Sequence, residues 1–160
     1  MQIQTSVQVI VNAKIADVFS ASTDCHNLPK FFTGYKGIPA ILSAKTVDGF
    51  PLHEGSIRIV DNSDGSSIEE VILSLKQPNL QEYKLIRGFK PPFFWLVRVA
   101  SGKWEYETVD TKTRVIWNFY FETRNIFAYF VFRLLVQHQF QKAQEICLKN
   151  LKNYVEDSDR

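Results

Sequence analysis

The order of the hydrophobic patterns constrains the fold of this chain more than any other feature. One alternating pattern typical of a strand comes first, two short helical patterns and a long run of strand patterns follow, and a helical pattern covers residues 125–155. A long antiparallel run followed by one helix that can cross it predicts a curved sheet gripping the helix, with space between them. We therefore expect an α+β fold, in which a curved antiparallel sheet in β-α-α-β6-α order wraps around a long C-terminal helix.

Short local signals place the individual elements. Residues 3–11 alternate between apolar and polar side chains, which predicts a half-buried strand. Residues 15–22 have helical spacing, and a second short helix is predicted around 24–32, where Pro29 limits its length. The Asp64-Gly65 dipeptide is the clearest hairpin signal. The remaining strand patterns cover residues 41–47, 55–61, 67–75, 83–89, 95–109 (with an interruption at Ser101-Gly102) and 113–123.

The final helical pattern has two halves of different character. In the second half Phe140, Ala143, Cys147, Leu151 and Tyr154 form an apolar stripe, as expected of a helix that lies on a sheet. In the first half, residues 126–136 are apolar almost all round. Such a segment needs a cover on its outer face, or it exposes a patch of the kind that contacts a partner or a ligand.

Composition excludes several classes of function. With 160 residues we expect one domain over 1–160, and a net charge of +2 from dispersed charges gives no basic face for nucleic acid. Cys25 and Cys147 are too few and too far apart for a disulfide framework or a zinc site, and we expect no metal and no cofactor. The first residues lack the pattern of a signal peptide, which favours a cytoplasmic protein. The apolar segment 126–136 is shorter than the about 20 residues that a bilayer span needs.

Several local motifs, taken in order, carry a family resemblance. They are residues 12–19, Leu28-Pro29-Lys30-Phe31, the pair Gly55-Ser56-Ile57-Arg58 and Glu69-Glu70-Val71, residues 113–117, and residues 148–152. Their order resembles the START-like, helix-grip superfamily, which includes birch-pollen-allergen-like proteins, abscisic-acid receptors, and polyketide cyclase/dehydrase and lipid-transport proteins. The resemblance implies a ligand cavity between sheet and helix. Hormone sensing is not implied, because the turn at 62–66 is too short to match the receptors' gate loop.

Side chains alternate between the two faces of a strand, and this alternation indicates which of them would line that cavity. Trp117 and Phe119 share one face of the last strand, and aromatic residues make up 14% of the chain. For each aromatic residue the simpler alternative is that it fills the core. The candidate ligand-binding residues are Glu69, Tyr83, Arg87, Phe89, Trp95, Trp104, Trp117, Phe119 and Phe130.

Glu69 is the polar residue that we consider first for acid–base chemistry in the cavity. It shares the parity of Val71, so it is a candidate for an inward carboxylate with a raised pKa that acts as an acid or base. Alternatively Glu69 is solvated at the hairpin end, or Glu70 is the inward residue in a shifted register. We expect Arg58 to form a surface cross-strand pair with Glu70. For Arg87, the commoner arrangement is an outward side chain, and an inward one would hold a ligand carboxylate.

These observations leave three classes of function open. The leading hypothesis is non-enzymatic binding or carriage of an apolar molecule that is lipid-like, polyketide-like or aromatic, and no catalytic residue is assigned. The first alternative is a cyclase- or dehydratase-like enzyme in which Glu69 and Tyr83 transfer protons. The second is an interaction module, with residues 126–136 as a dimer or partner surface on a monomeric or homodimeric protein. The same segment could instead make transient contact with a membrane.

Overall fold

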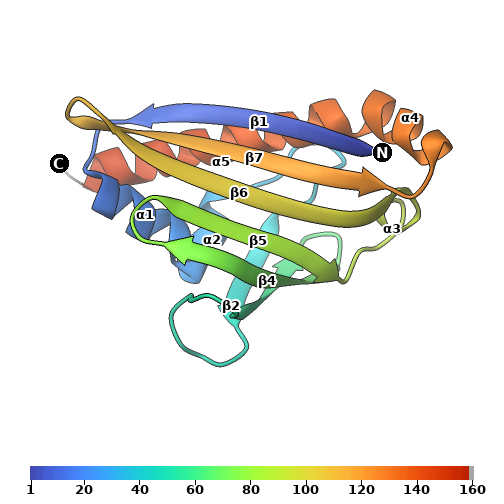
Figure 1. Cartoon of the computed structure of the whole chain (residues 1–160), viewed down its shortest axis with the longest axis horizontal. Helices are drawn as coiled ribbons and strands as arrows, with labels where there is room; N and C mark the ends of the chain where they lie inside the picture. Colours follow the sequence, from blue (N-terminus) through green and yellow to red (C-terminus); the bar gives the residue numbers. More distant parts are fainter. Residues whose placement is uncertain (159–160) are drawn as a thin grey trace.

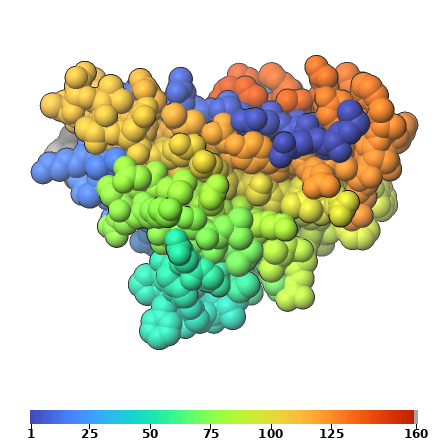
Figure 2. Space-filling view, viewed as in Figure 1, coloured from blue at the N-terminus to red at the C-terminus, as the bar shows by residue number. Residues whose placement is uncertain are grey.

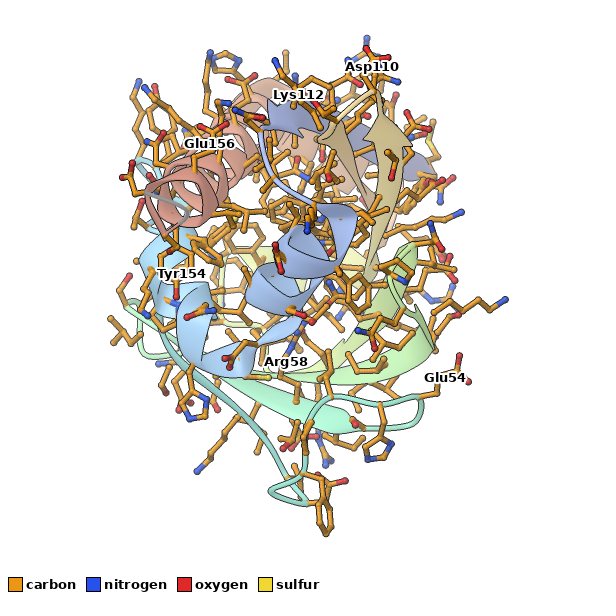
Figure 3. All side chains as sticks on the ribbon, turned by 90° about the vertical axis from the view of Figure 1, so that its left-hand side faces the viewer. Glu54, Arg58, Asp110, Lys112, Tyr154 and Glu156 are labelled. Carbon is orange, nitrogen blue, oxygen red and sulfur yellow. The ribbon has the colours of Figure 1, made fainter. Side chains whose placement is uncertain are left out.

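The structure, a computed structural model that describes residues 1–158, has seven antiparallel strands in the order β1-β7-β6-β5-β4-β3-β2. The sheet curves around helix α5, which lies behind it in Figure 1 and inside its curve in Figure 3. This arrangement confirms the predicted helix-grip fold. The elements in chain order are β1 (Gln2–Val11), α1 (Ile15–Thr23), η1 (Cys25–Asn27), α2 (Leu28–Phe31), β2 (Ile41–Thr46), β3 (Ile57–Asn62), β4 (Ser67–Lys76), β5 (Leu80–Arg87), α3 (Phe93–Leu96), β6 (Val97–Val109), β7 (Lys112–Thr123), α4 (Ile126–Leu135) and α5 (Gln137–Ser158).

The alternating pattern of β1 forms the expected half-buried strand. Ile3, Val7 and Val11 are buried, and the residues between them are mostly exposed. β1 pairs with β7, so the first strand of the chain lies beside the last, with Val7 opposite Trp117. Because directly opposite residues share a face, this register places one apolar layer against α5.

The hairpin between β3 and β4 forms at the predicted turn. The amide of Asn62 donates to the carbonyl of Ser66 at 2.9 Å, and the amide of Gly65 donates to the carbonyl of Asn62 at 3.0 Å. The Asp64 carboxylate accepts from the Ser66 amide at 2.8 Å, which fixes the turn. Gly65 has φ +84°, a conformation that glycine adopts without strain.

The prediction that a strand begins at Trp95 is wrong. Trp95 lies in the single helical turn α3, and β6 begins at Val97. The turn forms after Pro91-Pro92, where the Phe94 amide donates to the carbonyl of Lys90 at 3.1 Å. From Val97 onward β6 pairs with β7 without a break at Ser101-Gly102.

The C-terminal helical pattern forms two helices that meet at Val136. Asn125 caps α4, because its side chain accepts a hydrogen bond from the Ala128 amide at 2.8 Å. In α5 the predicted stripe is buried, except that Tyr154 is 37% exposed and Val155 takes the last buried position. The α5 side chain of Asn150 donates to the carbonyl of Phe31 at 2.9 Å, which ties α5 to α2. None of the helices within residues 1–158 is long and apolar enough to cross a membrane.

Gly102 leaves room for an inward aromatic ring, which gives a test of the fold. It lies opposite Tyr83 on β5, and a Cβ at this position would overlap the Tyr83 ring. We expect Gly102→Ala to lower the free energy of unfolding by about 1–3 kcal/mol, because the ring has to shift within a filled layer. Ser101→Ala, one residue along the same strand, should change it by less than about 0.5 kcal/mol. Urea unfolding of both variants measures the difference, and equal midpoints would contradict this account of Gly102.

Candidate functional site

A cavity of about 150 Å³ lies between the sheet and α5. Most of its lining is aromatic or aliphatic and comes from β3 to β7, α2 and α5. Exposed Asp64 and Lys90 also line it, so the cavity reaches the surface near the β3–β4 turn and the loop before α3. The volume is below the about 300–1,000 Å³ typical of pockets for drug-sized ligands, because large side chains fill part of the space.

Two stacked tryptophans form the centre of the apolar wall. Trp104 and Trp117 lie opposite each other on β6 and β7, with ring centroids 4.6 Å apart and an interplanar angle of 27°. Phe119 continues this wall and contacts Phe140 of α5 at a centroid distance of 4.8 Å. The buried Nε1–H of Trp117 has no acceptor among residues 1–158. The wall therefore offers aromatic faces together with one unpaired buried donor.

A buried ion pair forms the polar part of the cavity. The Arg58 Nε and Nη2 groups both donate to Oε2 of Glu70, at 2.8 and 2.5 Å. The two residues are only 3% and 8% exposed. In Figure 3 Arg58 lies inside the molecule, between the short N-terminal helices and the sheet, whereas Glu54 and Asp110 project from the edges. Both bonds end on the same carboxylate oxygen, so Oε1 of Glu70 remains available to a hydrogen-bond donor.

Further polar groups extend this ion pair into a network. Arg58 donates from Nη1 to Oε1 of Gln81 at 3.4 Å, and its guanidinium lies 5.2 Å from the centre of the Tyr83 ring. The Gln81 amide donates to the Tyr106 hydroxyl at 3.4 Å, and that hydroxyl lies 2.6 Å from Oγ of Ser22. We call these five residues and Glu70 the polar cluster. It joins β3, β4, β5, β6 and α1 across the cavity.

Burial and the neighbouring charges shift the pKa values of Arg58, Tyr83 and Tyr106 in the polar cluster. Burial pushes the pKa of Arg58 downward, but the Glu70 carboxylate opposes this and the net shift is upward, so the guanidinium stays charged. Burial raises the pKa of Tyr83 far above its usual value, and the Glu70 carboxylate raises it further. Burial likewise raises the pKa of Tyr106. Both tyrosines therefore remain neutral and keep their hydroxyl protons at physiological pH.

The expectation that Arg58 makes a surface pair is wrong, and so is the inward placement of Glu69. Arg58 and Glu70 lie opposite each other on the inner face, and Glu69 faces Ile59 on the outer face. Glu69 instead accepts a hydrogen bond from Arg87 at 2.5 Å, and the Arg87 side chain is 74% exposed. The alternative register, with Glu70 inward, is the one that the structure has.

The other sequence-predicted residues divide into two groups. Five of them line the cavity: Tyr83, Phe89, Trp104, Trp117 and Phe119. Trp95 and Phe130 lie outside it, at 65% and 53% exposure. Sequence reasoning placed Arg58 opposite Glu70 but missed that this pair is buried in the cavity, and it missed the role of Gln81 altogether.

A second, larger hollow of about 720 Å³ lies outside the space between sheet and α5. Most of its lining residues are exposed, including His26, Lys45 and Phe50, so it is a surface groove beneath the loop at 47–56. In that loop Nε2 of His53 lies 2.8 Å from Asp48, and this hydrogen bond raises the pKa of His53. The groove lacks the enclosed apolar wall of the cavity, which is therefore the candidate site.

The buried and surface ion pairs give a matched comparison on neighbouring residues. Glu70→Ala leaves the Arg58 guanidinium buried without its carboxylate, which we expect to cost about 3–5 kcal/mol of unfolding free energy. Glu69→Ala removes an exposed pair and should cost no more than about 1 kcal/mol. Urea unfolding of the two variants tests this. A loss of unfolding free energy in Glu69→Ala as large as that in Glu70→Ala would contradict the placement of Glu70 in a buried pair and of Glu69 in an exposed one.

Solved structures share this fold over nearly the whole chain. Ara h 8.0201 is 19% identical, with a TM-score of 0.69 over 98% of this chain and 99% of that one. The major latex-like protein 151 of Panax ginseng is 16% identical, with a TM-score of 0.71 over 96% and 97% of the two chains. Norcoclaurine synthase from Thalictrum flavumn, solved as a point mutant with a transition state analogue, is 12% identical, with a TM-score of 0.72 over 100% and 98%.

These identities are low, so the structural likeness concerns the fold alone. No curated protein matches the sequence. A family model, described as polyketide cyclase / dehydrase and lipid transport, matches residues 2–156. That match covers every strand and nearly all of α5. The chain therefore belongs to the polyketide cyclase/dehydrase and lipid-transport family.

Proposed function

We propose that this protein binds and carries an apolar small molecule that has one polar group. The observation that carries the proposal is the pairing of an aromatic wall with a single buried polar cluster in one cavity. Apolar area provides most of the affinity in such a site, and a few fixed polar groups orient the ligand. The ligand's polar group would meet Oε1 of Glu70 or the Tyr83 hydroxyl, and its apolar part would lie against Trp104 and Trp117.

The size of the cavity limits how the ligand is held. About 150 Å³ accommodates a small aromatic molecule or one end of a longer chain. A longer molecule would extend past Phe89 and Lys90, where the cavity reaches the surface. This geometry favours a lipid-like, polyketide-like or aromatic ligand with its polar end innermost.

The geometry supports carriage better than the enzymatic alternative. Glu69 lies on the outer face, which removes the version of that alternative in which Glu69 and Tyr83 transfer protons. The inward carboxylate, Glu70, accepts two hydrogen bonds from the charged Arg58 guanidinium, so it is already engaged in a buried ion pair. The Cys147 thiol also lines the cavity, and burial raises its pKa, so it lacks the thiolate character of a nucleophile.

A pair of variants on opposite faces of the sheet tests whether the cavity is the binding site. Leu85 lines the cavity, and Leu73 is exposed on the outer face of β4. The probe is N-phenyl-1-naphthylamine, an apolar aromatic dye with one N–H group whose fluorescence rises in apolar surroundings. We expect Leu85→Trp to fill the cavity and weaken dye binding about tenfold or more. Leu73→Trp should leave the affinity unchanged.

Two further measurements complete this experiment. Circular dichroism and urea unfolding establish that both variants keep the fold. Mass spectrometry of the purified protein under native conditions would show any apolar molecule that copurifies. Equal dye affinity in the two folded variants would overturn the proposal that the cavity holds the ligand.

A further inference from the structure

We propose that the exposed apolar surface of α3 and α4 docks onto an anionic lipid membrane. The surface consists of seven large side chains that are 51–77% exposed, and we call it the α3–α4 surface. Its members are Phe94, Trp95, Ile126, Phe127, Phe130, Leu134 and Leu135. Docking is a separate property from ligand binding in the cavity. The docking proposal does not depend on that ligand binding.

The two helices form one continuous surface. The ring of Phe93 in α3 contacts the ring of Phe132 in α4, with centroids 6.5 Å apart. Arg124, two residues before α4, adds a second link, because its Nε donates to the carbonyl of Phe94 in α3 at 2.7 Å. In Figure 2 the segments of α3 and α4 lie together at the right-hand end of the molecule. On α4, Ala128 and Phe132 are buried, so the helix presents its other side outward.

The charges around this surface are almost all positive. Residues 83–104 and 123–144 contain no Asp or Glu. Within these segments Lys90, Arg124 and Arg133 are exposed, and no carboxylate of residues 1–158 lies within 4.0 Å of their charged nitrogens. Arg98 has only a long contact of 3.6 Å with Glu122. This rim complements an anionic surface, while the chain as a whole carries only +2.

This combination favours a membrane over a second copy of the chain. Exposed Trp and Phe side chains bordered by Arg and Lys are typical of segments that lie in the headgroup region of a bilayer. The apolar side chains enter the acyl boundary, and the cations meet anionic headgroups. In a symmetric dimer the same surface would meet itself, so Arg124 and Arg133 would approach a like-charged rim without acidic partners.

The position of the surface also connects it to the cavity. Phe93 lines the cavity and belongs to α3, and Phe89 and Lys90 precede α3 at the point where the cavity reaches the surface. Docking through α3 and α4 would therefore bring the cavity opening close to the bilayer. The inference that an apolar ligand passes between bilayer and cavity rests on the proposed function, whereas the docking itself does not.

Flotation with lipid vesicles tests the proposal directly. We expect the full chain to float with vesicles of phosphatidylcholine mixed with phosphatidylserine, and much less with vesicles of phosphatidylcholine alone. Raising the salt concentration should weaken this binding, because salt screens exposed charges.

Trp95 gives an independent signal, since it is 65% exposed while Trp104 and Trp117 are both 4% exposed. Vesicles should shift its emission to shorter wavelength and protect it from acrylamide, and Trp95→Phe should remove both changes.

Substitutions on exposed positions separate docking from folding. We expect the double variant Phe127→Asp, Leu134→Asp to weaken vesicle binding about tenfold or more. Phe50→Asp is the control, because Phe50 is 68% exposed in the loop between β2 and β3, away from α3 and α4. Arg133→Gln should reduce binding to the phosphatidylserine vesicles while leaving the weak binding to phosphatidylcholine unchanged.

The possible outcomes decide the proposal. If the protein stays unbound while light scattering shows a dimer that the double variant dissociates, the surface is a self-association interface and the proposal is overturned. Equal flotation of the double variant and Phe50→Asp would also overturn it. Binding of N-phenyl-1-naphthylamine by the double variant, measured without vesicles, should match that of the unmodified protein. Failure of the cavity and failure of docking are therefore distinguishable.

Discussion

The buried pair of Arg58 and Glu70 is the interaction on which the candidate site depends. Removing two charges from water costs several kcal/mol per ion, so such a pair persists only where geometry and further hydrogen bonds offset the cost. Here Gln81 accepts from the guanidinium, the Tyr83 ring lies beside it, and a chain through Tyr106 reaches Ser22. The pair therefore fixes the relative positions of four strands and α1, and through them the shape of the polar part of the cavity.

The same aromatic residues that stabilise the fold also determine how much space remains. Trp104, Trp117 and Phe119 are each 4% exposed, and they belong both to the main core and to the cavity wall. Burying such rings contributes strongly to stability, but each ring also takes volume from a ligand. Gly102 illustrates the balance, because its missing side chain provides the space in which the Tyr83 ring lies. A cavity of about 150 Å³ is the result of this competition.

Sequence patterns predicted the fold well because its main signals are periodic and long. The alternation in β1, the Asp64-Gly65 turn and the stripe of α5 each specify a local structure, and their order specifies the architecture. The alternation of side chains along β4 was less informative about which residues face inward. Val71 and Leu73 on the outer face are as apolar as Ile68 and Ile72 on the inner face, so the pattern gave no contrast to decide which glutamate points inward. The turn α3 is too short to have a helical period at all.

The polar cluster and the α3–α4 surface give the cavity a direction. Tyr106 joins the cluster near one end of β6, whereas α3 immediately precedes Val97 at the other end of that strand. At about 3.3 Å per residue, the two positions are roughly 30 Å apart along the strand. A ligand that enters beside α3 would therefore pass polar groups one after another. Glu70 is in register with Ala100 through Leu85, and Tyr83 lies opposite Gly102, so both are nearer to α3 along the sheet than Tyr106 is. The polar group of the ligand would have to enter first, because a buried polar group without a hydrogen-bond partner costs free energy and these partners follow one another from the opening inward.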